Sequence, residues 1–213
     1  MDHQNIQIIF ATGNKGKIRE IKEILSCRPE IEVLSMREAG VEASPEENGA
    51  EFEDNALIKA QAVYDLLQTR PASSGTYRIV MSDDSGLEID ALGGAPGVHS
   101  ARYMGYDTDY RLRMEHLLSE LEGVPDENRT ARFVAAVAAI LPDGSSRLVR
   151  GTMEGRIGHE IAGRNGFGYD PFFYLPAYGM TSAEISPEEK NRISHRGKAL
   201  RSILRELGLL TQE

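Results

Sequence analysis

The sequence is poor in cysteine and in long apolar runs. Cys27 is the only cysteine among 213 residues, which excludes an internal disulfide and is compatible with a reducing cytosol. The longest uninterrupted apolar run, Phe133 to Leu141, is far shorter than the ~20 residues that a membrane helix needs. The first residues lack the basic and apolar regions of a signal peptide. We therefore expect a cytoplasmic protein without a membrane partner.

Basic residues are fewer than acidic ones. With 24 basic and 33 acidic residues, the net charge is −9. An acidic surface repels a phosphate backbone, which argues against a protein that coats DNA or RNA. A small anionic substrate is still compatible with this charge, because a local cluster of lysines acts within a Debye length of roughly 8 Å. The length suits a single domain over residues 1–213.

Apolar periodicity indicates alternating strands and helices. Strands are predicted over residues 6–11, 79–82, 87–91, 130–141 and 147–157. Helices are predicted over residues 17–25, 51–67 and 109–121, and a last helix begins near residue 195. This alternation predicts an α/β domain with a cleft between two lobes.

A glycine-rich turn, Ala11–Lys17, joins the first strand to the first helix. Its two glycines let backbone N–H groups approach an anion, and the helix N-terminus adds partial positive charge. Lys15 and Lys17 add full charges. The spacing is not that of a Walker A loop, and an ordinary turn with solvated lysines is the alternative interpretation.

Two acidic pairs are candidates for metal binding or proton transfer. Asp83 and Asp84 follow an apolar strand, where α/β sheets usually place their active sites, and Glu46 and Glu47 lie in a loop. Carboxylates of this kind suit Mg²⁺, and Ser85 adds a hydroxyl for a phosphate or the metal. The alternative for the aspartates is a solvated surface turn.

Two further segments could bind a base. Glycines around Phe167 expose a ring on which a purine can stack, and Asp170 can accept hydrogen bonds from a base edge. His195 and Arg196, at the start of the last helix, can donate to a carbonyl oxygen or a phosphate. A core bend and a polar helix start are the respective alternatives. The histidines lack the spacing of a zinc site.

Together these segments resemble the inosine/xanthosine triphosphate pyrophosphatase family. The matching pieces are ATGNKGKIRE (11–20), FEDNALIKA (52–60), DDSGLEIDALGGAPGVHSARY (83–103), GFGYDPFF (166–173) and EKNRISHRGKAL (189–200). The resemblance implies an elongated mixed central sheet flanked by helices, with a nucleotide-binding cleft between two lobes, in a homodimer. It also implies a Mg²⁺-dependent enzyme that hydrolyses ITP, dITP and XTP to the monophosphate and pyrophosphate, which keeps these nucleotides out of DNA and RNA.

The resemblance also implies a role for individual residues. Asp84 would accept a proton and bind the metal, together with Glu46 or Glu47. The residues that would hold the triphosphate are Thr12, Gly13, Asn14, Lys15, Gly16, Lys17, Lys59 and Ser85. Those that would hold the base and its neighbourhood are Phe167, Gly168, Tyr169, Asp170, Lys190, His195 and Arg196. Two alternatives stay open: a pyrophosphatase for modified pyrimidine nucleotides and a non-catalytic nucleotide-binding module.

Overall fold

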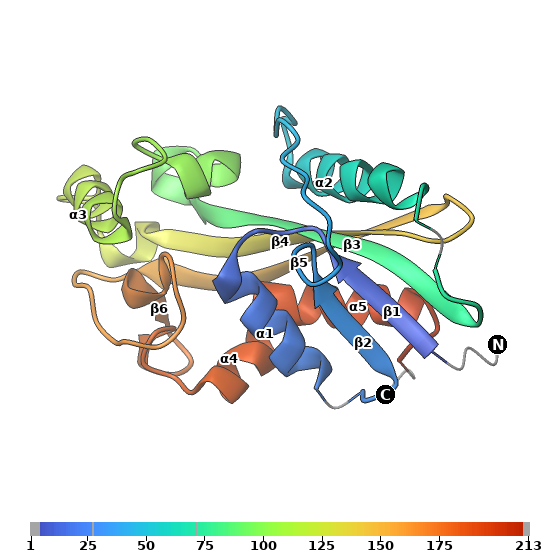
Figure 1. The fold of residues 1–213 in the computed structure, drawn as a ribbon. Coiled ribbons are helices and arrows are strands. Elements are labelled where there is room, and N and C mark those ends of the chain that lie inside the picture. Colours follow the sequence, from blue (N-terminus) through green and yellow to red (C-terminus); the bar gives the residue numbers. More distant parts are fainter. Residues whose placement is uncertain (1–4, 27, 71, 211–213) are drawn as a thin grey trace. The chain divides into compact units, whose positions relative to one another are not determined.

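The computed structural model describes residues 5–210, with the exception of residues 27 and 71, so Cys27 lies outside the described part. Seven strands form one sheet in the order β2-β1-β3-β4-β5-β6-β7, and helices flank it (Figure 1). The pairs β1–β2 and β1–β3 are parallel, whereas β5–β6 and β6–β7 are antiparallel. The predicted α/β class with a mixed central sheet is confirmed.

The secondary structure follows the predicted alternation closely. The strands are β1 (Asn5–Phe10), β2 (Ile31–Ser35), β3 (Thr76–Ile89), β4 (Thr130–Ile140), β5 (Ser146–Ile157), β6 (Phe173–Leu175) and β7 (Met180–Thr181). The α-helices are α1 (Lys15–Leu25), α2 (Phe52–Leu67), α3 (Tyr110–Glu120), α4 (Pro187–Ile193) and α5 (His195–Glu206). The sequence patterns did not predict β2, β6 or β7, because these strands are short or only partly buried.

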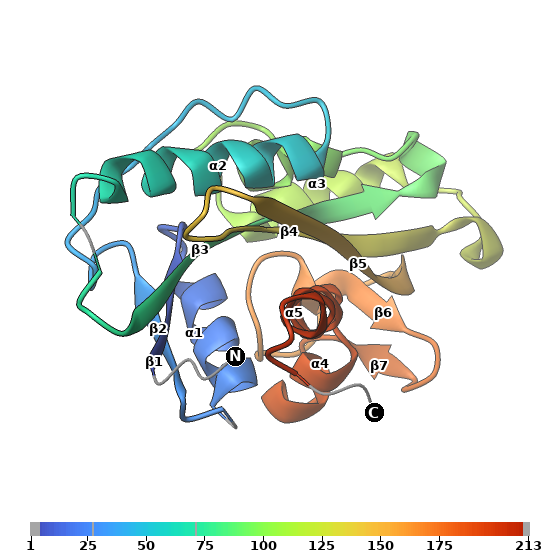
Figure 2. The same cartoon turned by 90° about the vertical axis from the view of Figure 1, so that its right-hand side faces the viewer.

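The chain divides into two compact units. Unit 1 comprises Met1–Asp84, Ala135–Arg150 and Arg196–Glu213, and unit 2 comprises Ser85–Val134 and Gly151–His195. In unit 1, α1 and α5 lie on one face of the strands and α2 lies on the other (Figure 2). Ile21 of α1 and Ile203 of α5 pack with Ile8 and Met81 in one buried cluster. The aliphatic core therefore fixes both helices against β1 and β3.

Unit 2 has a core of its own, which is richer in aromatic side chains. Leu117 of α3 packs in one cluster with Leu87, Phe133 and Phe172. Buried Arg113 donates hydrogen bonds to the backbone carbonyls of residues 100, 101 and 105 and so orders the loop that follows β3. A buried guanidinium needs such acceptors, because an unpaired one would be costly.

One prediction about β3 is wrong. Asp83 and Asp84 do not end a strand, because β3 runs without a break from Thr76 to Ile89 and joins two predicted strands. The pairing of β1 with β3 stops at Phe10 and Met81, so both aspartates lie just beyond the carboxyl end of β1 instead. The polar stretch stays extended because other parts of the chain supply partners for the carboxylates.

Within the part of the chain that the structure describes, no helix combines the length and the apolar character needed to cross a membrane.

Candidate active site

The adjacent residues Asp83 and Asp84 of β3 belong to different clusters of charged side chains in unit 1, because successive strand residues point to opposite faces of a sheet. Asp83 faces α1 and α5: its Oδ1 lies 2.5 Å from Lys17 Nζ, and its Oδ2 accepts a hydrogen bond of 3.0 Å from Arg196 Nε. Asp84 faces α2, where Lys59 Nζ lies 2.6 Å from its Oδ1. The side-chain alternation of one strand therefore separates the two carboxylates.

The Asp84 cluster also includes a loop that precedes α2. Lys59 Nζ lies 3.1 Å from Glu47 Oε2, so one ammonium contacts two carboxylates. Asn55 Nδ2 donates to Asp84 Oδ2 at 3.4 Å, while Asn55 Oδ1 accepts from Gly49 N at 2.9 Å. A Cβ at position 49 would lie 2.8 Å from Asn55 Oδ1, so only glycine fits this close approach. Asn55 thus holds both the loop and the carboxylate.

Burial and charge shift the pKa values of this cluster. Burial raises the pKa of Asp84 above its ordinary value, although Lys59 opposes the shift. Burial alone would lower the pKa of Lys59, but the attraction of Asp84 and Glu47 outweighs it and the pKa is raised. A carboxylate with a raised pKa is a better proton acceptor than an ordinary aspartate. Burial therefore gives Asp84 a higher proton affinity than an exposed aspartate has.

The Asp83 cluster is the more deeply buried of the two. Despite the cost of burial, the charges of Arg196 and Lys17 hold the pKa of Asp83 far below its usual range. Arg196 also donates to Glu20 of α1, and both side chains are almost fully buried. Burial lowers the pKa of Lys17, although Asp83 opposes this shift. These ion pairs connect α1, β3 and α5.

The predicted phosphate loop begins α1. Asn14 Oδ1 accepts hydrogen bonds from Gly16 N at 2.8 Å and Lys17 N at 3.1 Å, and it caps the helix. Thr12 Oγ1 accepts from Asn14 N at 3.2 Å. Two helix N-terminal donors are thus satisfied by the chain itself. Gly13 and Lys15 are exposed, and apart from the chain neighbours of Gly13 no atom of the described residues lies within 4 Å of where its Cβ would be.

The predicted base-binding segment lies in unit 2. Asp170 is buried, and its Oδ2 accepts hydrogen bonds from Phe167 N at 2.8 Å and Lys190 Nζ at 2.6 Å. Ser182 Oγ donates to Asp170 Oδ1 at 2.8 Å. The ammonium of Lys190 lies 5.1 Å from the centroid of the half-buried Phe167 ring, a cation–π distance. Asp170 therefore fixes the positions of both Phe167 and Lys190.

Two other predicted base-binding residues are buried in unit 2. Tyr169 is 4% exposed, and its hydroxyl donates to Ser100 O at 3.0 Å. His195 is 5% exposed, and its ring stacks on Phe133 with the centroids 5.0 Å apart. Gly168 has a φ of +64°, which a residue with a side chain adopts only under strain, and it gives the turn its shape.

The sequence analysis missed Asn55 and Glu20, which both contact predicted site residues. Both are buried polar side chains of helices. Asn55 lies one turn after buried Phe52 on α2, and a polar residue at such a position could have been noticed, because burial of a polar group requires a partner. Glu20 lies one turn after Lys17 on α1, so the pattern there gives no such signal.

The carboxylates of unit 1 fit a divalent metal with few protein ligands. Among the described residues, no group of three or more His, Cys, Asp or Glu is arranged around a common point. Glu47 and Asp84, however, converge closely enough to share the ammonium of Lys59. Mg²⁺ usually takes one or two carboxylates and completes its shell with water and substrate phosphates. Glu46 is exposed, whereas Glu47 is half-buried and points into the cluster.

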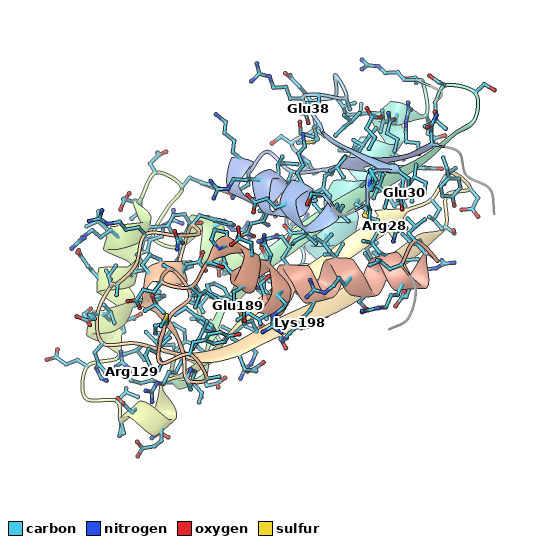
Figure 3. The ribbon with its side chains drawn as sticks, turned by 90° about the horizontal axis from the view of Figure 1, so that it is seen from below. Arg28, Glu30, Glu38, Arg129, Glu189 and Lys198 are labelled. Atoms are coloured by element: carbon cyan, nitrogen blue, oxygen red, sulfur yellow. The ribbon has the colours of Figure 1, made fainter. Side chains whose placement is uncertain are left out.

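A cavity of about 450 Å³ lies elsewhere in unit 2. It is lined by residues 118, 119 and 121–126 with Arg129 and His159, and none of the predicted site residues is among them. Arg129, labelled in Figure 3, donates to the backbone carbonyls of residues 121, 157 and 158. These contacts hold the two segments around Arg129 together.

Comparison with known proteins agrees with the motifs. The family model described as the Ham1 family matches residues 8–206. A dITP/XTP pyrophosphatase of Geobacillus kaustophilus is 47% identical over 194 residues, which cover 91% of this chain and 90% of that protein. The corresponding Bacillus subtilis protein is 45% identical over 92% of this chain and 94% of its own length. The structure of the Staphylococcus aureus Ham1 protein superposes with a TM-score of 0.80 at 37% identity, covering 95% of this chain and 98% of that one. This chain belongs to the Ham1 family.

Proposed function

We propose that this protein is a nucleoside-triphosphate pyrophosphatase that hydrolyses non-standard purine nucleotides such as ITP, dITP and XTP to the monophosphate and pyrophosphate. The observation that carries the proposal is the cluster of Asp84, Glu47 and Lys59 in unit 1. It combines a buried proton acceptor, a second carboxylate and a cation. The relatives named dITP/XTP pyrophosphatase support the choice of substrate.

In this proposal the chemistry takes place at Asp84. Its carboxylate orients a water molecule and accepts a proton from it as the water attacks the α-phosphorus. Glu47 and Asp84 would hold a Mg²⁺ ion, which neutralises charge on the phosphate oxygens when bound. Lys15, Lys17 and Lys59 add positive charge where negative charge develops on the departing pyrophosphate. The hydroxyl of Ser85 and the backbone of residues 12–16 complete the proposed phosphate contacts.

We assign recognition of the base to residues of unit 2 and to Arg196. A purine would stack on Phe167, whose position Asp170 fixes. A donor from His195 or Arg196 would pair with the 6-oxygen of hypoxanthine or xanthine, and Lys190 would lie in the neighbourhood of the base. Adenine carries an amino group at this position and leaves such donors unpaired, a mismatch that discriminates strongly. Tyr169 and Gly168 support the ring through the shape of the turn.

We extend the proposal to a homodimer in the cytoplasm that acts on free nucleotides. The net charge of −9 supports the choice of free nucleotides over DNA or RNA, because the acidic surface repels a polymer of phosphates.

The products of ITP test the proposed reaction. We expect IMP and pyrophosphate as the first products, because the lysines are assigned to the β- and γ-phosphates as a unit. Anion-exchange chromatography of early time points measures this. IDP and orthophosphate as first products would contradict the proposal and indicate a phosphatase. Faster turnover of dTTP or UTP than of ITP or XTP would instead favour the pyrimidine alternative.

The two loop glutamates are expected to differ in their effect on metal use. Glu47→Gln should raise the Mg²⁺ concentration for half-maximal turnover about tenfold or more, because one anionic ligand is lost. Glu46→Gln is the matched control and should leave it unchanged, since this side chain is exposed. The measurement is pyrophosphate release against Mg²⁺ concentration. If only Glu46→Gln raised the Mg²⁺ concentration for half-maximal turnover, Glu46 rather than Glu47 would be the metal ligand.

A further inference from the structure

The position of Lys59 coincides with the place proposed for the metal. The side chain rises from α2, is 13% exposed, and reaches Asp84 Oδ1 at 2.6 Å and Glu47 Oε2 at 3.1 Å. Asn55 contacts the other oxygen of Asp84. The two carboxylates come from segments 37 positions apart in the chain (84 − 47) and share one ammonium. Lys59 thus occupies the point on which both carboxylates converge.

A metal ion and this ammonium exclude one another at that point. Mg²⁺ binds carboxylate oxygens at about 2.0–2.1 Å, which is inside the contact that Lys59 makes with Asp84. In a partly buried site, the repulsion between an ammonium and a divalent ion is weakly screened. Binding of the metal therefore requires Lys59 to give up at least one carboxylate. A lysine that leaves a carboxylate needs another anion, because a buried unpaired charge is unfavourable.

We propose that Lys59 is a resident counter-ion that competes with the divalent metal for Glu47 and Asp84 and releases them when the triphosphate arrives. The inference rests on the proposed function for the metal and the substrate. Without nucleotide, Lys59 neutralises the carboxylates and keeps the affinity for free Mg²⁺ low. When a triphosphate is present, its oxygens accept Lys59, and the carboxylates become available. Metal and nucleotide therefore bind with positive coupling.

The competition can be measured without any turnover. Mg²⁺ alone is titrated calorimetrically into the nucleotide-free protein, into Lys59→Met and into Lys59→Gln. Methionine has a similar length without the charge, and glutamine retains the ability to donate hydrogen bonds, so at least one variant should keep the fold. We expect the Kd for Mg²⁺ to fall about tenfold or more in both variants, because the competing charge is gone.

Lys17→Met is the matched control. It removes the same charge from a neighbouring buried lysine that pairs with Asp83 rather than with Asp84 or Glu47. We expect its Kd for Mg²⁺ to change much less than that of Lys59→Met. The double variant Lys59→Met/Glu47→Gln should not bind Mg²⁺ more tightly than the parent, because one of the two carboxylate ligands is missing.

Two results would overturn the inference. One is an unchanged Kd for Mg²⁺ in both Lys59 variants. The other is an equal fall of this Kd in Lys17→Met, which would mean that any loss of positive charge nearby strengthens Mg²⁺ binding. ITP turnover by the parent protein is measured separately. If the parent hydrolyses ITP but the Kd for Mg²⁺ is unchanged in the Lys59 variants, only the role of Lys59 is rejected. If the parent releases no pyrophosphate, the proposed function is rejected.

Discussion

We expect Asp84→Asn to lower the rate of ITP hydrolysis by about 10²–10⁴-fold while the protein stays folded, because asparagine cannot accept the proton of the attacking water. Burial raises the pKa of Asp84, so the folded state disfavours its charged form. We expect the protein to stay folded, because Lys59 keeps Glu47 as a charged partner when Asp84 is replaced. The measurements are kcat for pyrophosphate release and a thermal melt of each protein.

Asp65→Asn is the matched control for this experiment. Asp65 is exposed and accepts a hydrogen bond from Gln61 on the same helix, so the substitution should leave both activity and melting unchanged. Activity of Asp84→Asn close to that of the parent would remove Asp84 from the role of general base. Loss of activity together with loss of the fold would contradict the prediction that the two properties separate.

At the neighbouring position we expect Asp83→Asn to destabilise the fold by about 3–5 kcal/mol, because Arg196 and Lys17 lose the buried carboxylate that they share. The folded state depresses the pKa of Asp83 below the ordinary value of 3.8. For such an acid, the stabilisation is complete above the unfolded pKa and is lost as the pH falls below it. Urea denaturation at neutral and acid pH measures both effects.

Glu38→Gln gives the control for Asp83→Asn. Glu38, labelled in Figure 3, pairs with Lys22 at 2.7 Å, but the pair is exposed and water screens its charges. We expect little change in its free energy of unfolding. An equally small change in Asp83→Asn would show that the buried ion pairs do not stabilise unit 1. The parent and Asp83→Asn should differ less in free energy of unfolding at acid pH than at neutral pH. An equal difference at both pH values would also contradict the prediction.

Motifs and periodicity were sufficient to predict much of this protein. The period of apolar residues placed α2 and α3 to within a residue or two, because a helix that covers a core needs a continuous apolar stripe. Ser186 caps α4 and Pro187 is its first residue, a start signal that lies within a few residues of sequence. The motifs also indicated the family, and they supplied the list of candidate site residues.

Only the tertiary structure decided what those side chains contact. The sequence could not place Asp83 and Asp84 on opposite faces, because a polar stretch stays in a strand only if distant segments supply its partners, and Arg196 lies 113 positions away. It left Glu46 and Glu47 equivalent, whereas the loop geometry around Gly49 directs Glu47 to Lys59. Local patterns act over a few residues, while buried charges pair across the chain, and those pairs determine the local environment of each carboxylate.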